Sequence, residues 1–226
     1  MIYLYTGTPG SGKSLHVARE MQKWMSLYKS PVIGNFSFNV AIAKQKGHGG
    51  YLYLDNDLIT PDFLLWFSER YRKERKWEKV PEETILLVLD ECQLIFNARE
   101  WNAAYRKQWV SFFTQHRKLG YRVILICQFA EMIDKQIRSL VEYEFIHRKL
   151  KNIGVFGFLL NMISLGGLHI AVKRYAPLKE KVGQEFFKSN RYLFALYDSY
   201  NTFSGDAGGV DPLAGSGTQA CPEKVL

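Results

Sequence analysis

The sequence has little cysteine and no visible secretion signal. Its three cysteines, Cys92, Cys127 and Cys221, are widely spaced and odd in number. Two of them lie in or beside apolar runs, so we expect reduced, buried thiols rather than disulfides or a metal cluster. The first apolar run, MIYLY, is too short for a cleavable signal peptide. These absences argue against a secreted protein and favour a reducing compartment.

The sequence also lacks internal repeats, and its overall composition is ordinary. Hydrophobic residues make up 47% and charged residues 23% of the 226 positions, as is typical of a soluble α/β protein. The net charge of +8 permits contact with nucleic acid or anionic lipid but establishes neither.

A glycine-rich stretch, YTGTPGSGKS, follows the first apolar run and fits the pattern G-x-x-x-x-G-K-[ST]. Backbone N–H groups of such a loop point at phosphate oxygens, the lysine reaches the β and γ phosphates, and the serine hydroxyl binds Mg²⁺. The run before it reads as a buried strand and the run after it as an amphipathic helix. This context favours a nucleotide site over a glycine-rich turn that fits the pattern by chance. The expected nucleotide contacts are Gly7, Thr8, Pro9, Gly10, Ser11, Gly12, Lys13, Ser14 and Leu15, with Lys13 also catalytic and Ser14 a magnesium ligand.

An acidic pair, Asp90-Glu91, ends the apolar run ILLVL. An Asp at the carboxyl end of a buried strand can hold Mg²⁺, usually through water, opposite Ser14. A Glu directly after it can polarise the attacking water. The alternative is a solvent-facing acidic strand end, which is less credible beside a phosphate loop. We therefore predict Asp90 as a metal residue and Glu91 as the catalytic base.

Other candidates are weaker. Gln128 ends the next buried run and could sense the γ phosphate, although a polar strand cap explains it almost as well. An arginine that stabilises the transferring charge can act in cis or from a neighbouring subunit. Arg117 is our preferred choice, and the full set of candidates is Arg99, Arg106, Arg117, Arg122 and Arg138. A GTPase is disfavoured because no N-K-x-D motif occurs.

Strands and helices alternate through residue 150, which predicts a mainly parallel sheet with helices on both faces. Helices are expected near 62–80 and 102–119, the second closed by Gly120. Many residues, with other strand-like runs among them, separate the phosphate loop from Asp90-Glu91. This separation suits a sheet in which another strand lies between the strand before the loop and the strand before Asp90. We predict a P-loop NTPase of the additional-strand, catalytic-Glu type, with an ATPase domain over 1–203, its core over 1–150 and a disordered tail over 204–226.

Two stretches leave alternatives open. The basic run with Arg70, Arg72, Arg75 and Lys76 reads as a solvated helix face with i,i+4 ion pairs, or as a nucleic-acid contact. Residues 153–172 are long enough to span a bilayer, but Asn161, His169 and four glycines interrupt them. We favour a β-hairpin of residues 155–160 and 168–172, against a membrane-facing or partner-facing surface.

These motifs together resemble the N-terminal ATPase domain of the zonula occludens toxin family, which includes the assembly ATPase of filamentous phages. The resemblance covers residues 1–204. The matching pieces are MIYLYTGTPGSGKSLHVARE, VIGNF, LLVLDECQLIF, FFTQHRKLGYRVILICQ, IRSLVEYEFIHRKL and LYDSYNTFSG.

The resemblance implies an ATPase, using ATP and Mg²⁺, at the cytoplasmic face of the host inner membrane. It would power extrusion of phage single-stranded DNA while coat proteins assemble, as a ring, possibly a hexamer. Relatives carry a membrane helix after the segment similar to LYDSY. Because no later hydrophobic span follows here, we expect either a truncated chain or a naturally short member.

Three other functions remain open. A generic DNA-packaging or conjugation motor would share both motifs, and a nucleotide-gated interaction protein would bind ATP with little turnover. A secreted toxin is suggested only by the family name, and the missing signal peptide and the free cysteines count against it.

Overall fold

In the computed structural model, which describes residues 1–39, 50–97, 103–149, 167–189 and 191–197, the described strands form one sheet. Their order is β3-β2-β4-β5-β1-β6-β7-β8. Neighbours from β3 to β6 pair in parallel, whereas β7 pairs antiparallel with both β6 and β8. The strands are β1 (Ile2–Thr6), β2 (Val32–Gly34), β3 (Tyr51–Tyr53), β4 (Ile85–Leu89), β5 (Tyr121–Ile126), β6 (Tyr143–Lys149), β7 (Leu168–Tyr175) and β8 (Glu180–Lys188).

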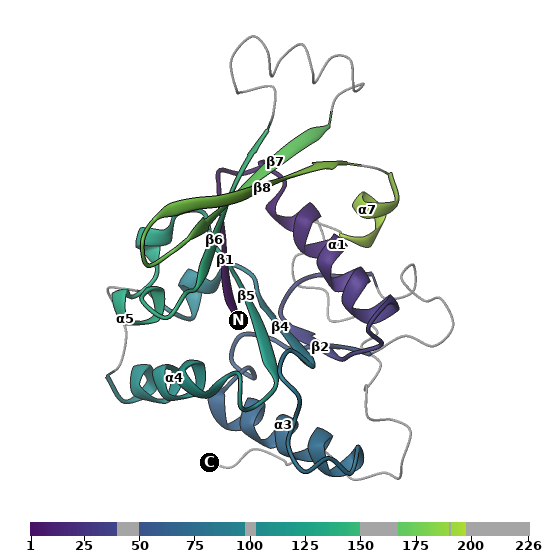
Figure 1. Cartoon of the computed structure of the whole chain (residues 1–226), viewed down its shortest axis with the longest axis vertical. Helices are drawn as coiled ribbons and strands as arrows, with labels where there is room; N and C mark the ends of the chain where they lie inside the picture. Colours follow the sequence, from purple (N-terminus) through teal and green to yellow (C-terminus); the bar gives the residue numbers. More distant parts are fainter. Residues whose placement is uncertain (40–49, 98–102, 150–166, 190, 198–226) are drawn as a thin grey trace.

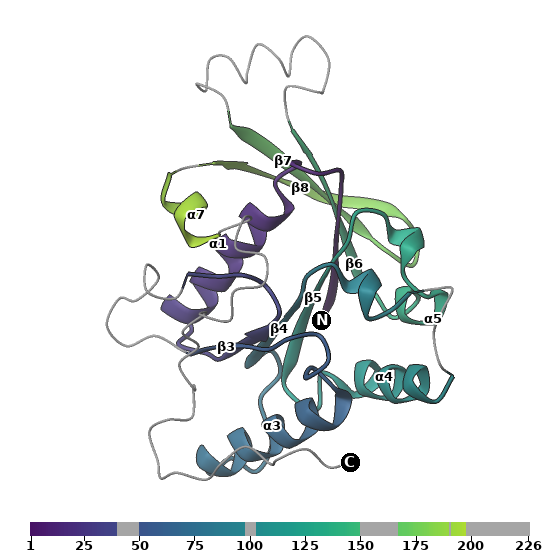
Figure 2. The same cartoon turned by 180° about the vertical axis from the view of Figure 1, so that it is seen from behind.

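Helices cover both faces of the parallel part of the sheet, as predicted. Figures 1 and 2 show α1 and α7 on one face, with α3 and α4 on the other. The helices are α1 (Lys13–Ser26), α3 (Pro61–Glu74), α4 (Ala103–Gln115), α5 (Lys135–Arg138) and α7 (Arg191–Leu196), with 3₁₀ turns η1 (Cys92–Leu94) and η2 (Ala130–Met132). This is the predicted fold, with β5 between the strand before the phosphate loop and the strand before Asp90.

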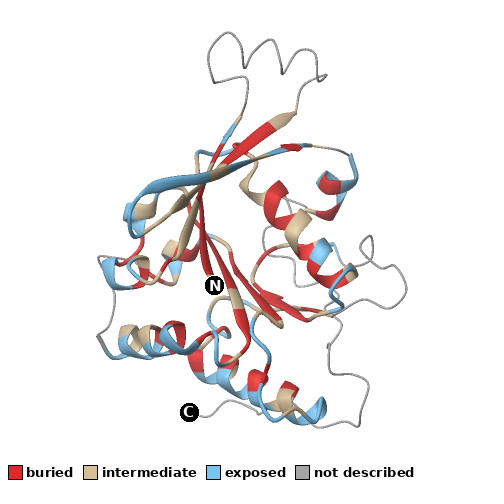
Figure 3. Ribbon diagram, viewed as in Figure 1, coloured by how far each residue is buried: buried red, intermediate tan, exposed pale blue. Residues whose placement is uncertain are grey.

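The core consists of two layers because the side chains of each central strand alternate between the faces. Ile2 and Leu4 of β1 lie in the cluster that includes residues of α3 and α4, whereas Tyr3 and Tyr5 lie in the cluster that includes residues of α1. All five residues of β1 and of β4 are buried, which explains why both read as continuous apolar runs. Figure 3 shows this buried centre. The loops that follow β1, β4 and β5 therefore all begin at the carboxyl ends of buried, neighbouring strands.

Local signals account for several helix boundaries. Thr60 caps α3 by accepting a hydrogen bond from the Phe63 N–H at 3.2 Å, and Pro61 opens the helix. α4 ends at Gln115, before the predicted end at 119, and Gly120 follows in a left-handed conformation with φ 78°. A Cβ on Gly120 would lie 2.3 Å from Val80, so the turn into β5 requires glycine there.

The antiparallel end of the sheet differs from the predicted hairpin. The described hairpin is β7–β8, over Leu168–Lys188, and β7 also pairs with β6. The run predicted as the second strand, 168–172, lies within β7, whereas the predicted first strand, 155–160, and Asn161 lie outside the described residues. β8 was not predicted, because its sequence is polar and only Phe187 is buried. None of the described helices is long and apolar enough to cross a membrane.

The charged face of α3 is paired within itself. Arg70 contacts Glu74 at 3.0 Å and Arg72 contacts Glu69 at 2.7 Å, and the Arg70 guanidinium also covers the Trp66 ring. These contacts favour the solvated-face interpretation over a nucleic-acid contact. Cys92 and Cys127 are buried free thiols, as predicted, and burial raises the pKa of Cys92 well above its ordinary value.

Candidate functional site

The phosphate loop leaves the carboxyl end of β1 at the centre of the sheet and enters α1. Gly7, Gly10 and Gly12 all have positive φ, at 141°, 70° and 99°. Gly12 is the N-cap residue of α1, and no side chain caps this helix end. The free N–H groups of the first turn, together with the positive end of the helix dipole, form a site for an anion.

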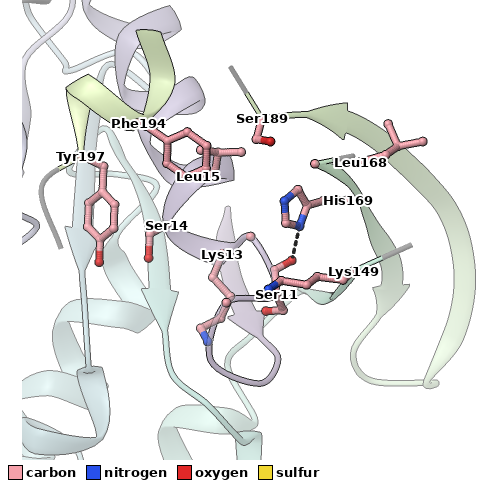
Figure 4. A pocket seen from close by; sticks show the side chains of 13 residues that line it. Ser11, Lys13, Ser14, Leu15, Lys149, Leu168, His169, Ser189, Phe194 and Tyr197 are labelled. Atoms are coloured by element: carbon pink, nitrogen blue, oxygen red, sulfur yellow. Dashed lines mark hydrogen bonds between the residues drawn. The ribbon is translucent and has the colours of Figure 1, made fainter. Parts of the chain in front are cut away.

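Close packing against β6 and β7 also requires two of these glycines. A Cβ on Gly7 would lie 2.6 Å from the His147 carbonyl oxygen, and a Cβ on Gly12 would lie 2.6 Å from Nδ1 of His169. His169 Nδ1–H donates to the Ser11 carbonyl at 2.9 Å, the dashed line in Figure 4. The loop that carries Lys13 is therefore supported by β6 and β7, a role that sequence reasoning missed.

A buried pair of histidines lies beneath the loop. Burial lowers the pKa of His147 to about 3, with His16 adding to the effect, so His147 is neutral near pH 7. Its Nδ1 lies 3.1 Å from the Thr6 carbonyl and 3.0 Å from the Phe145 carbonyl, so this nitrogen carries the proton. Its Nε2 then accepts from Nδ1–H of His16, at 2.9 Å. This chain of bonds ties the first turn of α1 to the end of β1.

Lys13 lies over the loop as predicted. Its ammonium donates to the Gly7 carbonyl at 2.6 Å. Burial lowers the pKa of Lys13, while the carboxylates of Glu91 and Asp90 oppose that shift. The two carboxylates are therefore close enough to interact electrostatically with Lys13, which brings both sequence motifs to one place.

Asp90 follows β4 and is mostly buried. Burial raises its pKa to about 6, and the Glu91 carboxylate adds to the rise, whereas the Glu91 N–H and Lys13 oppose it. The Glu91 N–H donates to Asp90 Oδ1 at 2.9 Å. No other hydrogen bond to the Asp90 carboxylate is found among the described residues. The other carboxylate oxygen of Asp90 is open among the described residues, and in its deprotonated form Asp90 can bind a divalent cation.

Glu91 has an unusual backbone conformation and an exposed side chain. Its φ and ψ are both 44°, in the left-handed region that non-glycine residues seldom adopt. The Gln93 side chain donates to Glu91 Oε2. Such local strain is a feature of functional sites when the surrounding structure maintains it.

Asn35, at the end of β2, maintains the backbone at Asp90. Its side-chain oxygen accepts from the Asp90 N–H at 2.6 Å, and its side-chain nitrogen donates to the Asp90 carbonyl at 2.8 Å. The same nitrogen lies 2.5 Å from Oδ1 of Asn56. Sequence reasoning missed Asn35, although a polar residue directly after a buried strand was the signal used for Asp90 and Gln128.

Gln128 lies where it was expected, at the carboxyl end of β5 between the two motifs. Its backbone carbonyl accepts from the Gly7 N–H at 3.1 Å, so the end of β5 is tied to the start of the phosphate loop. Its side chain is half-buried. This placement agrees with a role at the phosphates, and that role stays a prediction.

The preferred arginine, Arg117, lies at the wrong edge of the sheet for a role in cis. It pairs with Glu142 at 2.6 Å, between the end of α4 and the start of β6. The phosphate loop follows the opposite ends of these parallel strands, so Arg117 cannot reach a phosphate bound to its own chain. Arg122 pairs with Glu83 at that same amino edge. The other two described candidates contact neighbours elsewhere, Arg106 with Asp134 and Arg138 with the Ala130 carbonyl, and Arg99 lies outside the described residues.

A cavity of about 560 Å³ opens beside the phosphate loop (Figure 4). It extends from the loop and the first turn of α1 to β6, β7 and α7. The lining residues are Gly10, Ser11, Gly12, Lys13, Ser14, Leu15, Lys149, Gly167, Leu168, His169, Ser189, Phe194 and Tyr197. The Lys149 ammonium lies 3.1 Å from where a Cβ on Gly10 would be, which places a second cation against the loop.

Comparison with known proteins identifies the family. A family model described as zonular occludens toxin (Zot) matches residues 1–204. The chain belongs to the Zot family. A curated relative, the Gene 1 protein of Enterobacteria phage I2-2, is 33% identical over 215 residues, which cover 91% of this chain and 58% of the relative. The chain thus spans less than two thirds of the length of that relative.

Solved structures agree on the fold. The N-terminal domain of zonular occludens toxin from Neisseria meningitidis has a TM-score of 0.55 at 17% identity, covering 87% of this chain and 98% of that one. B204, the DNA-packaging ATPase from Sulfolobus turreted icosahedral virus, has a TM-score of 0.50 at 12% identity, covering 84% and 97%. Both similarities support the P-loop NTPase architecture of this Zot-family chain.

Proposed function

We propose that this chain is an ATPase that powers assembly and extrusion of filamentous phage at the inner face of the host inner membrane. The observation that carries the proposal is the convergence of Lys13, Asp90 and Glu91 at the uncapped start of α1. The Gene 1 relative and the Zot family supply the biological setting. B204, which shares the fold, is itself named a DNA-packaging ATPase.

Each residue takes a role that follows from its position. The loop N–H groups and Lys13 bind the phosphates of ATP. Ser14, on the first turn of α1, and Asp90 hold Mg²⁺, which when bound would neutralise charge on the β and γ phosphates. Glu91 orients a water molecule and accepts its proton, and Gln128 contacts the γ phosphate from the end of β5. Lys149 adds positive charge at Gly10.

The left-handed backbone and the Gln93 contact leave the Glu91 carboxylate restrained. The Gln93 contact engages only Oε2, so Oε1 stays available to accept a proton. We expect the chain to act as a ring. In such a ring an arginine from a neighbouring subunit, Arg117 included, completes the site. A hexamer, single-stranded DNA, coat and channel proteins, and a membrane segment outside this chain belong to the same proposal.

ATP hydrolysis by the purified chain, over a series of protein concentrations and with or without single-stranded DNA, tests this function. We expect specific activity to rise with concentration and with DNA, and to vanish in Lys13→Ala. ATP binding without turnover under every condition would favour the nucleotide-gated interaction protein instead. Turnover that does not respond to single-stranded DNA would remove the argument for direct contact with the strand.

A further inference from the structure

The cavity beside the phosphate loop lies on the β6 and β7 side of β1, across from β4 and β5. Asp90 and Gln128 follow β4 and β5, which lie on one side of β1 in the sheet. Lys149, Leu168 and His169 belong to β6 and β7, on the other side of β1. A nucleotide whose terminal phosphate faces Glu91 therefore directs its sugar and base away from β4 and into this cavity.

The size and lining of the cavity suit that part of a nucleotide. Its volume of about 560 Å³ lies within the range of ordinary small-molecule sites, roughly 300–1,000 Å³. Leu15 provides apolar surface, while Lys149, His169 and Ser189 provide polar groups. Figure 4 shows these side chains around one space, with Phe194 and Tyr197 extending toward the first turn of α1 from α7 and the residue that follows it, whereas the Leu168 side chain points away.

The Phe194 side chain is not part of the hydrophobic core that Leu193 and Leu196 join. Its side chain is 59% exposed, although it lies on a short helix whose Leu193 and Leu196 are buried. Tyr197, by contrast, is held in place by stacking on Phe36 at 4.8 Å. An exposed aromatic ring at the wall of a cavity offers a flat surface on which a base can stack.

We propose that this cavity holds the ribose and base of the nucleotide, with the Phe194 ring stacked on a purine. This inference rests on the proposed ATP site and adds the part of the chain that recognises the base. Because stacking depends on ring area, purine nucleotides bind more tightly than pyrimidine nucleotides. Ser189, Phe194 and Tyr197 thus form part of the nucleotide site.

The test compares nucleotide binding by the full chain and by Phe194→Ala, with Phe194→Trp as the conservative variant. Removal of a stacking partner should weaken ATP binding roughly 5- to 100-fold and reduce the preference for ATP over UTP. Phe194→Trp should keep both the affinity for ATP and the preference for ATP over UTP.

Tripolyphosphate, which has no base, should bind Phe194→Ala and the original chain equally. Phe186→Ala, at an exposed phenylalanine of β8 outside the cavity lining, is the matched control and should change none of these values.

The outcomes separate this inference from the proposed function. If Lys13→Ala loses both ATP and tripolyphosphate while Phe194→Ala binds ATP normally, the phosphate site stands and the base site is wrong. If Phe194→Ala loses tripolyphosphate as well as ATP, Phe194 supports the structure and the stacking role is wrong. If the original chain binds neither ligand, the proposed function itself fails.

Discussion

At the scale of single residues, the site depends on one backbone position, Asp90, that is fixed from two sides. Asn35 bonds to both its N–H and its carbonyl, and the Glu91 N–H bonds to its carboxylate. The sequence motif identified Asp90 and Glu91 because their chemistry is local to the end of one strand. The same signal was present at Asn35, directly after β2, but it did not reveal the contact with Asp90, which exists only once β2 and β4 are paired.

Asn35→Asp should lower kcat by about 10- to 100-fold with little change in KM for ATP, because the variant loses the donor to the Asp90 carbonyl and Asn35 lies outside the phosphate loop. Steady-state kinetics with an unfolding curve would show this split. Asn56→Ala, which removes a contact to Asn35 but none to Asp90, is the control and should have the smaller effect. A rise in KM at constant kcat would contradict the positioning role.

The raised pKa of Asp90 makes a prediction about pH. Since the folded-state pKa of about 6 exceeds the ordinary value of 3.8, ionisation of Asp90 reduces stability. This cost is absent below about pH 4 and fully present above about pH 6. In metal-free buffer Asp90→Asn should therefore stabilise the chain at pH 7.5, by on the order of 3 kcal/mol, and should have little effect at pH 4. Thermal unfolding at the two pH values measures this, and equal effects at both would contradict it.

At the scale of elements, the antiparallel strands hold the phosphate loop. His169 of β7 bonds to Ser11 and lies against Gly12, and the His147 carbonyl of β6 lies against Gly7. This explains why a hairpin far along the sequence belongs to the site.

Gly12→Ala tests this support, because the new Cβ would meet the His169 ring and the backbone there has φ 99°. We expect loss of ATP binding, and destabilisation of about 1–3 kcal/mol. Gly183→Ala, on β8, is the matched control, because its Cβ would meet nothing within 4 Å, and it should behave as the original chain. Calorimetric ATP titration reports binding, and urea unfolding reports stability. Normal ATP affinity in Gly12→Ala would contradict the account.

The elements also show how far sequence reasoning extends. Buried parallel strands such as β1, β4 and β5 were predicted because a strand covered on both faces is continuously apolar. β8 was missed because an exposed edge strand carries no such signal. The choice of Arg117 left action in cis or from a neighbouring subunit open, and the structure disfavours action in cis. A helix that leads into a parallel strand ends at the amino edge of the sheet, away from the loop, and this direction was not considered.

At the scale of the whole molecule, the described residues supply the proposed ATP site. The chain spans 58% of the Gene 1 protein of phage I2-2, and membrane attachment and contacts with coat proteins are part of the proposed function. The charges of α3 are paired within the helix, so the net charge of +8 does not by itself mark a DNA-binding face.

The central claim is that the carboxylates after β4 form a hydrolytic site with the loop after β1. Replacement of Glu91 by Gln keeps the side-chain shape and removes the base. The most direct measurement is therefore ATP binding together with ATP hydrolysis, made on the original chain and on Glu91→Gln under the same conditions. We predict that Glu91→Gln binds ATP with unchanged affinity and loses at least 100-fold in turnover, on the order expected for removal of a general base. Unchanged turnover in Glu91→Gln would contradict the claim.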